Sequence, residues 1–168
     1  MKEININELQ FNPFTKIGKD WMLVTSTDGE KTNSMTASWG GLGVLWDKNV
    51  AFIVLRPQRY TKEFVDRSEE FSLSFFDDSY KKTLGYFGSI TGRDEDKISK
   101  SGLHLSFINN VPTFEEASLV LTCKNLYKHV LTQDEFVDKS IVDLDYKAND
   151  YHTLYLAEIT GAFSKDWF

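Results

Sequence analysis

Two apolar stretches near the middle of the chain, "VAFIVL" at 50–55 and "FSLSFF" at 71–76, constrain its fold more than any other feature. The first stretch is apolar throughout, which predicts a strand covered on both faces. In the second, Phe71, Leu73 and Phe75 alternate with serines, the pattern of a strand with one buried face. The fold therefore has to bury two strands that lie close together in the chain.

The segment between these strands predicts a short helix. Pro57 cannot donate a hydrogen bond to a strand ladder, so the first strand ends before it. In "YTKEFVDRS", 60–68, Phe64 falls on an apolar helical face, and charged residues fall on the other face. A second short helix is expected in "SYKKTLGYF", 79–87, with Ser79 as its N-cap.

Several further segments have the composition of strands, and glycines or polar turns separate them. No βαβ alternation is visible, and no repeat or linker divides the chain, so we expect one domain over 1–168. Six or so strands with small helices predict a mainly β fold of the α+β class, an antiparallel β-barrel with helical insertions. The further strands are expected at "WMLVTST" (21–27), in the first half of "SMTASWGGLGVLW" (34–46), in the long "ASLVLTCKNLYKHVLT" (117–132) and in "YHTLYLAEITGAF" (151–163).

Charge and cysteine content narrow the classes of partner. The formal net charge is −6 and the sequence pI is about 5.1, so the chain repels a phosphodiester backbone, and nucleic acid is not expected as a partner. The single cysteine, Cys123, excludes an internal disulfide and is expected to be a buried strand thiol. The N-terminal "MKEININELQ" has neither the apolar core of a signal peptide nor a membrane span, so we expect a cytoplasmic protein.

The segment "RPQRYTKEF", 56–64, is a candidate anion site. Arg56 closes the apolar strand, and Arg59 and Thr61 begin the helix, whose free N–H groups favour anions. The planar fork of arginine matches phosphate oxygens at two points, which lysine cannot do. The alternative is that both arginines form surface ion pairs with Glu63, Glu69 or Glu70, and spacing alone leaves both possibilities open.

Two other stretches could contact a small molecule. "TNSMTASWGGLG", 32–43, combines small polar side chains with glycines, so its backbone N–H groups could face a flat polar heterocycle; a glycine-loosened hairpin is the alternative. His152 stands at the start of the last predicted strand. No two histidines have metal-ligand spacing, and the chain contains no nucleophile elbow, P-loop or GxGxxG motif.

Taken in order, these segments resemble a known family. "NSMTASWGGLGVLW", then "VAFIVLRPQRYTKEF", then "FSLSFF" is similar in order and spacing to the flavoredoxin-like branch of the flavin reductase-like, FMN-binding split-barrel family. "TGRDEDK" and "DYHTLYLAEI" are similar to its later landmarks, so the likeness runs from about Trp21 to Ile159. Two differences are that His152 follows Asp150 and Tyr151 where Gly-Asp often stands, and that Ala157 replaces a common glycine.

The resemblance implies a six-stranded antiparallel Greek-key split barrel that forms a homodimer, with one FMN per subunit near the interface. It implies that His152 lies beside the flavin where a nicotinamide approaches, and that backbone amides near Thr36 and Ala37 reach the N5/O4 edge of the ring. The expected FMN contacts are Asn33, Met35, Thr36, Ala37, Ser38 and Trp39 at the ring, and Arg56, Arg59, Tyr60 and Thr61 at the phosphate.

The function implied is that of an FMN-dependent oxidoreductase that passes hydride or electrons from NAD(P)H through FMN to an acceptor, either a partner protein or free flavin. One alternative within the same fold is an electron-transfer protein that keeps FMN bound and does not react with NAD(P)H. A second alternative, from another class, is a small barrel that serves as a binding module without catalysis.

Overall fold

Antiparallel pairing organises the chain, which the computed structural model describes over residues 1–165. Its main sheet has eight strands: seven follow the order β3-β2-β6-β9-β10-β5-β4, and β1 pairs with β10. Adjacent strands are antiparallel throughout this sheet. The strands are β1 (Lys2–Ile4), β2 (Met22–Thr27), β3 (Thr32–Ala37), β4 (Gly40–Leu45), β5 (Lys48–Leu55), β6 (Glu70–Phe75), β9 (Leu119–Val130) and β10 (Thr153–Ser164).

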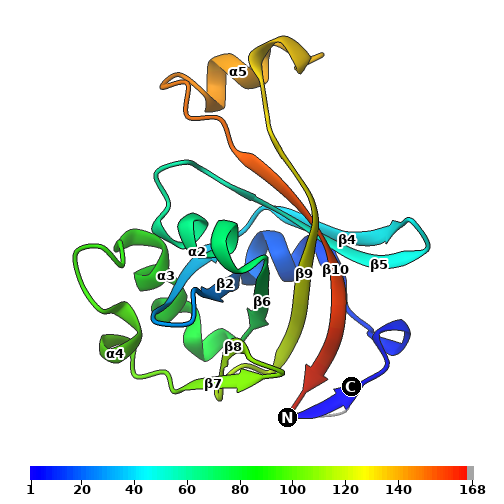
Figure 1. Ribbon diagram of the computed structural model, residues 1–168, viewed down its shortest axis with the longest axis vertical. Coiled ribbons are helices and arrows are strands. Elements are labelled where there is room, and N and C mark those ends of the chain that lie inside the picture. The colour runs from blue at the N-terminus through cyan, green and yellow to red at the C-terminus, as the bar shows by residue number, and fades with distance from the viewer. Residues whose placement is uncertain (166–168) are drawn as a thin grey trace.

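A second, two-stranded sheet and several short helices surround this sheet. In Figure 1, α2, α3 and α4 lie on the side of β2 and β6, and the β4–β5 hairpin extends from the opposite side. Among residues 1–165, no helix has the length and apolar character needed to span a membrane. The second sheet contains β7 (Leu105–Ile108) and β8 (Val111–Phe114), and the α-helices are α1 (Pro13–Thr15), α2 (Tyr60–Ser68), α3 (Lys81–Ser89), α4 (Lys97–Ser101) and α5 (Ser140–Asp145), with a π-helix at Lys16–Asp20 and 3-10 turns at Ile6–Glu8, Asp78–Tyr80 and Gln133–Glu135.

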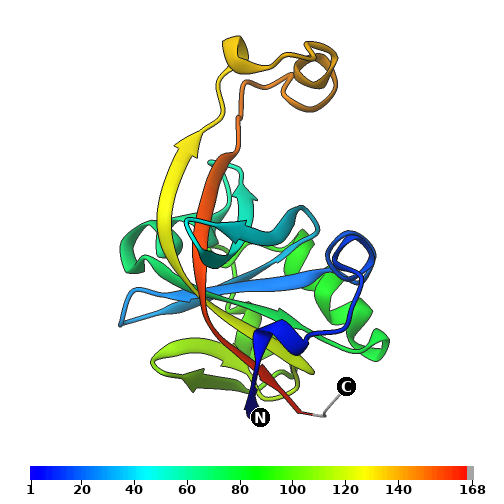
Figure 2. The same ribbon diagram turned by 90° about the vertical axis from the view of Figure 1, so that its right-hand side faces the viewer.

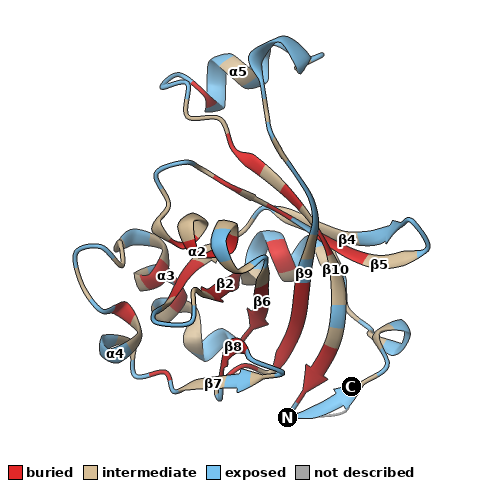
Figure 3. Ribbon diagram, viewed as in Figure 1, coloured by how far each residue is buried: buried red, intermediate tan, exposed pale blue. Residues whose placement is uncertain are grey.

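Alternation along the strands places apolar side chains on both faces of the central sheet. In β2, Met22 and Val24 belong to one core cluster, whereas Leu23 belongs to the other. The first cluster lies inside the curled sheet, and the second is covered by Phe87 of α3 and Phe114 of β8. Figure 3 shows the buried residues concentrated along β2, β6, β8 and the lower parts of β9 and β10. The expected mainly β fold with short helices is confirmed, and β4 and β1 extend the six expected strands.

The structure corrects two local expectations. The strand at 50–55 is not covered on both faces, because Phe52 in β5 is 38% exposed and its ring lies over Gly41 of β4, where a Cβ would come within 2.3 Å of it. Ser79 does not cap a helix; it lies within a 3-10 turn, and α3 begins only at Lys81.

The segment 34–46 forms parts of two strands, β3 and β4, rather than one. The expected helix at 60–68 is confirmed as α2. The last strand begins at Thr153, so His152 stands directly before it. The pairing of β9 with β10 contains two register shifts, at Leu156/Ala157 and at Ile159/Gly161.

Cys123 lies in the middle of β9 and has no exposed surface. Burial in apolar surroundings raises the pKa of its thiol, because the charged thiolate is not solvated there. The prediction of a buried strand thiol is confirmed.

The segment 131–152, which we call the arm, joins β9 to β10 and carries α5. Figures 1 and 2 show the arm extending away from the sheet beyond the ends of both strands. At its base the peptide N–H of Leu131 donates to the carbonyl of His152 at 2.9 Å. The ladder between β9 and β10 therefore continues to the first and last residues of the arm.

Candidate functional site

Two adjoining cavities lie between β3, the start of α2 and the loop after α3. Their volumes are about 500 Å³ and about 400 Å³, and both are lined by Met35, Gln58 and Arg59. Each of the eleven residues expected at a cofactor site lines at least one of them. Asn33, Tyr60 and Thr61 line the larger cavity, Thr36, Ala37, Ser38, Trp39, Arg56 and His152 line the smaller one, and Met35 and Arg59 line both.

The position of β3 explains why it can line a cavity. It is the last strand on its side of the sheet and pairs only with β2, so alternate peptide groups on its outer side have no strand partner. The Thr36 hydroxyl donates to the carbonyl of Leu84 in α3, and the Asn33 amide donates to Thr61 Oγ1 in α2 at 2.8 Å. These two side chains fix β3 between two helices and leave its backbone facing the cavities.

Two cations, the half-buried Arg59 and the buried Lys97, define one end of the larger cavity. Arg59 donates to the carbonyl of Gly88 at 3.2 Å, and Lys97, only 3% exposed, donates to the carbonyl of Phe87 at 3.0 Å. Within residues 1–165, neither side chain has an ion-pair partner.

The electrostatics of this pair are unfavourable without an anion. Burial lowers the pKa of Lys97 to about 8, and the charge of Arg59 contributes in the same direction. Burial and the charge of Arg56 also lower the pKa of Arg59. Because buried charges are costly unless they are paired, this end of the cavity is suited to bind an anion.

The start of α2 adds neutral donors to the same end. Arg59 occupies the N-cap position with an extended backbone, and no side chain caps the helix. The first N–H groups of the helix, next to Thr61, are therefore available to a ligand. Thr61 itself is buried and lines the cavity.

Arg56 has a different set of contacts, all with the arm. Its guanidinium pairs with Asp150 at 2.7 Å, donates to the carbonyl of Asp145 at 2.9 Å, and lies over the ring of Tyr146 at 5.3 Å. The alternative that Arg56 and Arg59 pair with Glu63, Glu69 or Glu70 is therefore wrong for both arginines. Arg56 still lines the smaller cavity, but it is already neutralised by a carboxylate.

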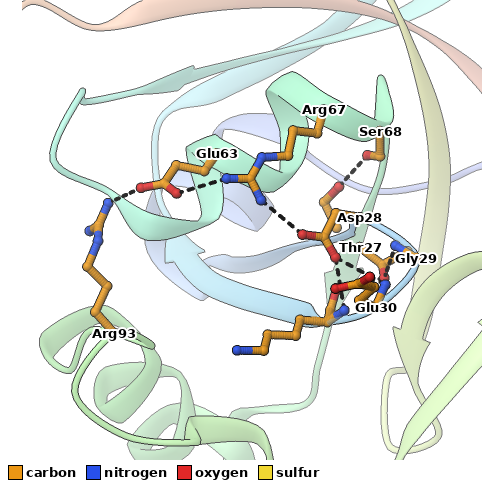
Figure 4. A network of polar contacts seen from close by, with 10 residues as sticks. Thr27, Asp28, Gly29, Glu30, Glu63, Arg67, Ser68 and Arg93 are labelled. Atoms are coloured by element: carbon orange, nitrogen blue, oxygen red, sulfur yellow. Dashed lines mark hydrogen bonds and ion pairs between the residues drawn. The ribbon is translucent and has the colours of Figure 1, made fainter.

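The loop that closes the larger cavity is attached to α2 by charged side chains. Arg93 pairs with Glu63, and its guanidinium lies 4.7 Å from the ring centroid of Tyr60. Figure 4 shows Glu63 between Arg93 and Arg67, with Arg67 reaching on to Asp28 in the β2–β3 turn. This network joins three segments and holds the loop 90–96 against the start of α2.

His152 is buried beside the smaller cavity, with 6% of its surface exposed. Its Nδ1 lies 2.7 Å from the hydroxyl of Tyr146, and its ring centroid lies 5.3 Å from that of Trp39. Burial, helped by the charge of Arg56, lowers the pKa of His152 to about 4. The imidazole is therefore neutral at pH 7 and does not act as a cationic acid there.

Sequence reasoning missed several residues of the larger cavity, of which Lys97 is the most important. The segment 88–102 is polar and rich in glycine, so its pattern predicts an exposed loop, and nothing local indicates that one lysine turns inward. The other missed residues that line this cavity are Gln58, Ser89, Ile90, Thr91, Gly92, Asp94, Glu95 and Lys100. Three histidines, the single cysteine and the carboxylates form no metal-binding cluster within residues 1–165.

Comparison with known proteins gives three findings. A family model described as a flavin reductase like domain matches residues 14–166. No significant match to a curated protein sequence was found. Solved structures with the same fold include flavoredoxin from Methanosarcina acetivorans (21% identity, TM-score 0.68, 99% of this chain and 77% of that chain), flavoredoxin from Desulfovibrio vulgaris Miyazaki F (20%, 0.69, 99% and 78%), and an FMN-binding domain of a flavin reductase-like enzyme from Shewanella baltica (18%, 0.69, 97% and 76%).

The imidazole environments predict separate titrations in an NMR experiment. His104 pairs with Glu116, whose hydrogen bond and charge raise the pKa of His104, so this exposed ring should take up its proton above the ordinary value of about 6.5. His152 should remain neutral until the pH approaches about 4. Because the unfolded chain binds that proton at about pH 6.5, this residue should reduce folding stability progressively between about pH 6.5 and 4. A titration of His152 at or above that of His104 would contradict the assignment.

Proposed function

Because this chain belongs to the flavin reductase-like domain family, we propose that it binds FMN and passes hydride or electrons from NAD(P)H through it to an acceptor. The observation that carries the proposal is the pair of unpaired cations, the half-buried Arg59 and the buried Lys97, beside the open N-terminus of α2. An FMN phosphate carries about −1.5 to −2 charge, as other phosphomonoesters do. It supplies the negative charge that these groups lack.

The relative strengths of these contacts indicate which groups would bind the phosphate. A hydrogen bond to a charged group contributes about 1.5–3 kcal/mol, whereas a helix terminus contributes about 0.3–1 kcal/mol. Arg59 and Lys97 therefore dominate phosphate binding, and Thr61 and the first N–H groups of α2 orient it. Arg56 contributes mainly by anchoring the arm, since its charge is paired with Asp150.

The ring end of the site is the smaller cavity. Met35, Ala37 and Trp39 supply apolar and aromatic surface, and the unpaired peptide groups on the outer side of β3 supply donors to a polar ring edge. Donors aimed at an edge that becomes more electron-rich on reduction favour the reduced ring. The bound flavin supplies the redox chemistry, and the protein supplies binding, orientation and electrostatics.

His152 is the last residue of the arm and lines the smaller cavity, where it would face a second substrate. A neutral imidazole beside Trp39 can orient a planar ring through contact and one hydrogen bond. Hydride transfer needs donor and acceptor atoms about 3–3.5 Å apart, so orientation is the main requirement on the protein. No side chain has to act as a strong acid or base.

The proposed assembly is a homodimer with the site near its interface. Tyr127 of β9, Leu156 of β10 and Phe52 of β5 stand opposite one another across three strands. Tyr127 and Phe52 are exposed, and Val54, on the same face as Phe52, lines the cavity of His152. A second copy of the chain on this face would cover the apolar row and close the side of the cavity.

The β4–β5 hairpin exposes further apolar side chains, of which Leu45 lies on the same face as Phe52. Val44, Leu45 and Trp46 are exposed at its end, and Trp39, half exposed, stands at its base. Contiguous exposed apolar surface of this kind marks interfaces in soluble proteins.

Two other functions make different predictions. An electron-transfer flavoprotein of the same fold would bind FMN but would react with neither NADH nor NADPH. A binding module without cofactor would be colourless when purified and would take up no added FMN. The absorbance spectrum of the purified protein, before and after addition of FMN, separates the module from both flavin functions.

Arg59→Ala should weaken FMN binding about tenfold to a hundredfold, the effect of losing one charged hydrogen bond. It should affect riboflavin little, since riboflavin has the same ring system without the phosphate. Arg67→Ala is the matched control, because Arg67 lies on the same helix and pairs with Asp28 and Glu63 outside the cavities. Fluorescence titration measures all four affinities, and equal losses for FMN and riboflavin would remove Arg59 from the phosphate site.

His152→Ala should retain FMN and slow its reduction by the nicotinamide. In anaerobic stopped-flow mixing, the wild-type protein loaded with FMN should lose its flavin absorbance with NADH or NADPH, and the variant should do so more slowly. If neither nucleotide reduces the wild type, the electron-transfer alternative replaces the reductase. If the variant matches the wild type, His152 has no part in this step.

Phe52→Glu combined with Tyr127→Glu should convert the dimer to a monomer, because two carboxylates would be buried in an apolar interface. Phe107→Glu is the control: Phe107 is an exposed aromatic residue in β7, on the separate two-stranded sheet. Sedimentation velocity at micromolar concentration measures the mass against the 19.4 kDa of one chain. If the wild-type protein is a monomer, the proposed dimer is wrong, and the proposal that the protein binds FMN is unaffected.

A further inference from the structure

We propose that Tyr146 is a positioning residue that holds His152 in the tautomer with its proton on Nε2. The evidence is the short contact between the phenol hydroxyl and Nδ1, at 2.7 Å, between two side chains that are both almost fully buried. Tyr146 follows α5 in the arm, so this contact joins the arm to the edge of the smaller cavity.

The first step is that both groups are neutral at pH 7. Burial lowers the pKa of His152 to about 4, so one ring nitrogen carries a proton and the other accepts a hydrogen bond. Burial also raises the pKa of the Tyr146 hydroxyl, which therefore keeps its proton. The charged groups that act on these two side chains come from β5, the start of α2 and the arm: Arg56, Arg59, Asp145 and Asp150.

The second step decides which group donates. Nδ1 of His152 is the only side-chain atom among residues 1–165 that lies within hydrogen-bond distance of the phenol hydroxyl. If Nδ1 donated to the phenol oxygen, the phenol proton would have no side-chain acceptor among the aromatic rings that surround it. When the phenol donates to Nδ1 instead, both the phenol proton and the lone pair of Nδ1 have a partner, as buried polar groups require.

The third step is that the phenol has little freedom to leave this position. The ring of Tyr146 stacks on that of Tyr151 at 4.7 Å and contacts Phe136 at 5.5 Å. The guanidinium of Arg56, held by Asp150, lies over the same ring at 5.3 Å. These contacts hold the Tyr146 hydroxyl at Nδ1 of His152 from several sides.

The consequence is a permanent N–H donor at Nε2. This nitrogen has no hydrogen-bond partner among residues 1–165, and Trp39 limits the rotation of the ring. Such a donor matches a carbonyl oxygen; this last step rests on the proposed function, because both the flavin ring and a nicotinamide carboxamide carry one.

Long-range ¹H–¹⁵N NMR of uniformly ¹⁵N-labelled protein at pH 7 tests the assignment directly. In the wild type, His152 should show a protonated Nε2 and an unprotonated Nδ1. A proton on Nδ1, or two tautomers in comparable amounts, would overturn the proposal. The measurement needs neither FMN nor activity, so its outcome is independent of whether the proposed function is correct.

A pair of substitutions tests the role of the hydroxyl. Tyr146→Phe should shift His152 from one tautomer to a mixture, whereas Tyr151→Phe should leave the spectrum unchanged. Tyr151 is the matched control, because its ring stacks on Tyr146 and its buried hydroxyl has no hydrogen-bond partner among residues 1–165. An unchanged tautomer in Tyr146→Phe would overturn the proposal, and if that variant fails to fold, the wild-type spectrum still decides the tautomer.

Discussion

The antiparallel ladder between β9 and β10 supports the core, the apolar face and the arm at the same time. It runs from the pair Leu119–Ser164 at one end to Val130–Thr153 at the other. Near the Leu119–Ser164 end both strands are buried, whereas toward the other end β9 becomes largely exposed while Tyr155 and Ala157 of β10 remain in the core. The register of this single ladder therefore places His152 relative to β5. If one of the two strands slipped by one residue, each of its side chains would move to the opposite face of the sheet.

Desolvation and ion pairing together determine which cations of the site keep an uncompensated positive charge. The chain is acidic, and carboxylates neutralise most of its arginines: Arg67 and Arg93 pair with Glu63, and Arg56 pairs with Asp150. Arg59 differs because its guanidinium donates to the carbonyl of Gly88 in α3 and has no carboxylate partner among residues 1–165. A cation in this environment loses hydration without gaining an internal counter-charge, and an external anion restores the balance. The proposed anion site is thus confined to one small region of an otherwise acidic chain.

How far the sequence predicts this molecule depends on the range of the interactions involved. The strands at 22–27 and 70–75 and the helix at 60–68 follow from local alternation and helical periodicity, which a sequence displays directly. The resemblance to a family brought the eleven expected site residues, ten for the cofactor and His152, into one hypothesis, and all of them line two adjoining cavities. The inward position of Lys97 and the pairing of Arg56 with Asp150 depend on loop packing and on contacts 94 residues apart in the chain. No local pattern encodes such contacts.

Cys123 lies on the same ladder, opposite Ile159 of β10 and Phe71 of β6. A thiol reagent can reach Cys123 only when these strands separate. The rate at which the thiol is alkylated therefore measures the opening of the sheet. A ligand that binds only the folded sheet lowers the population of the opened state, so it would slow this alkylation. The only thiol of the chain therefore reports how often the sheet around it opens.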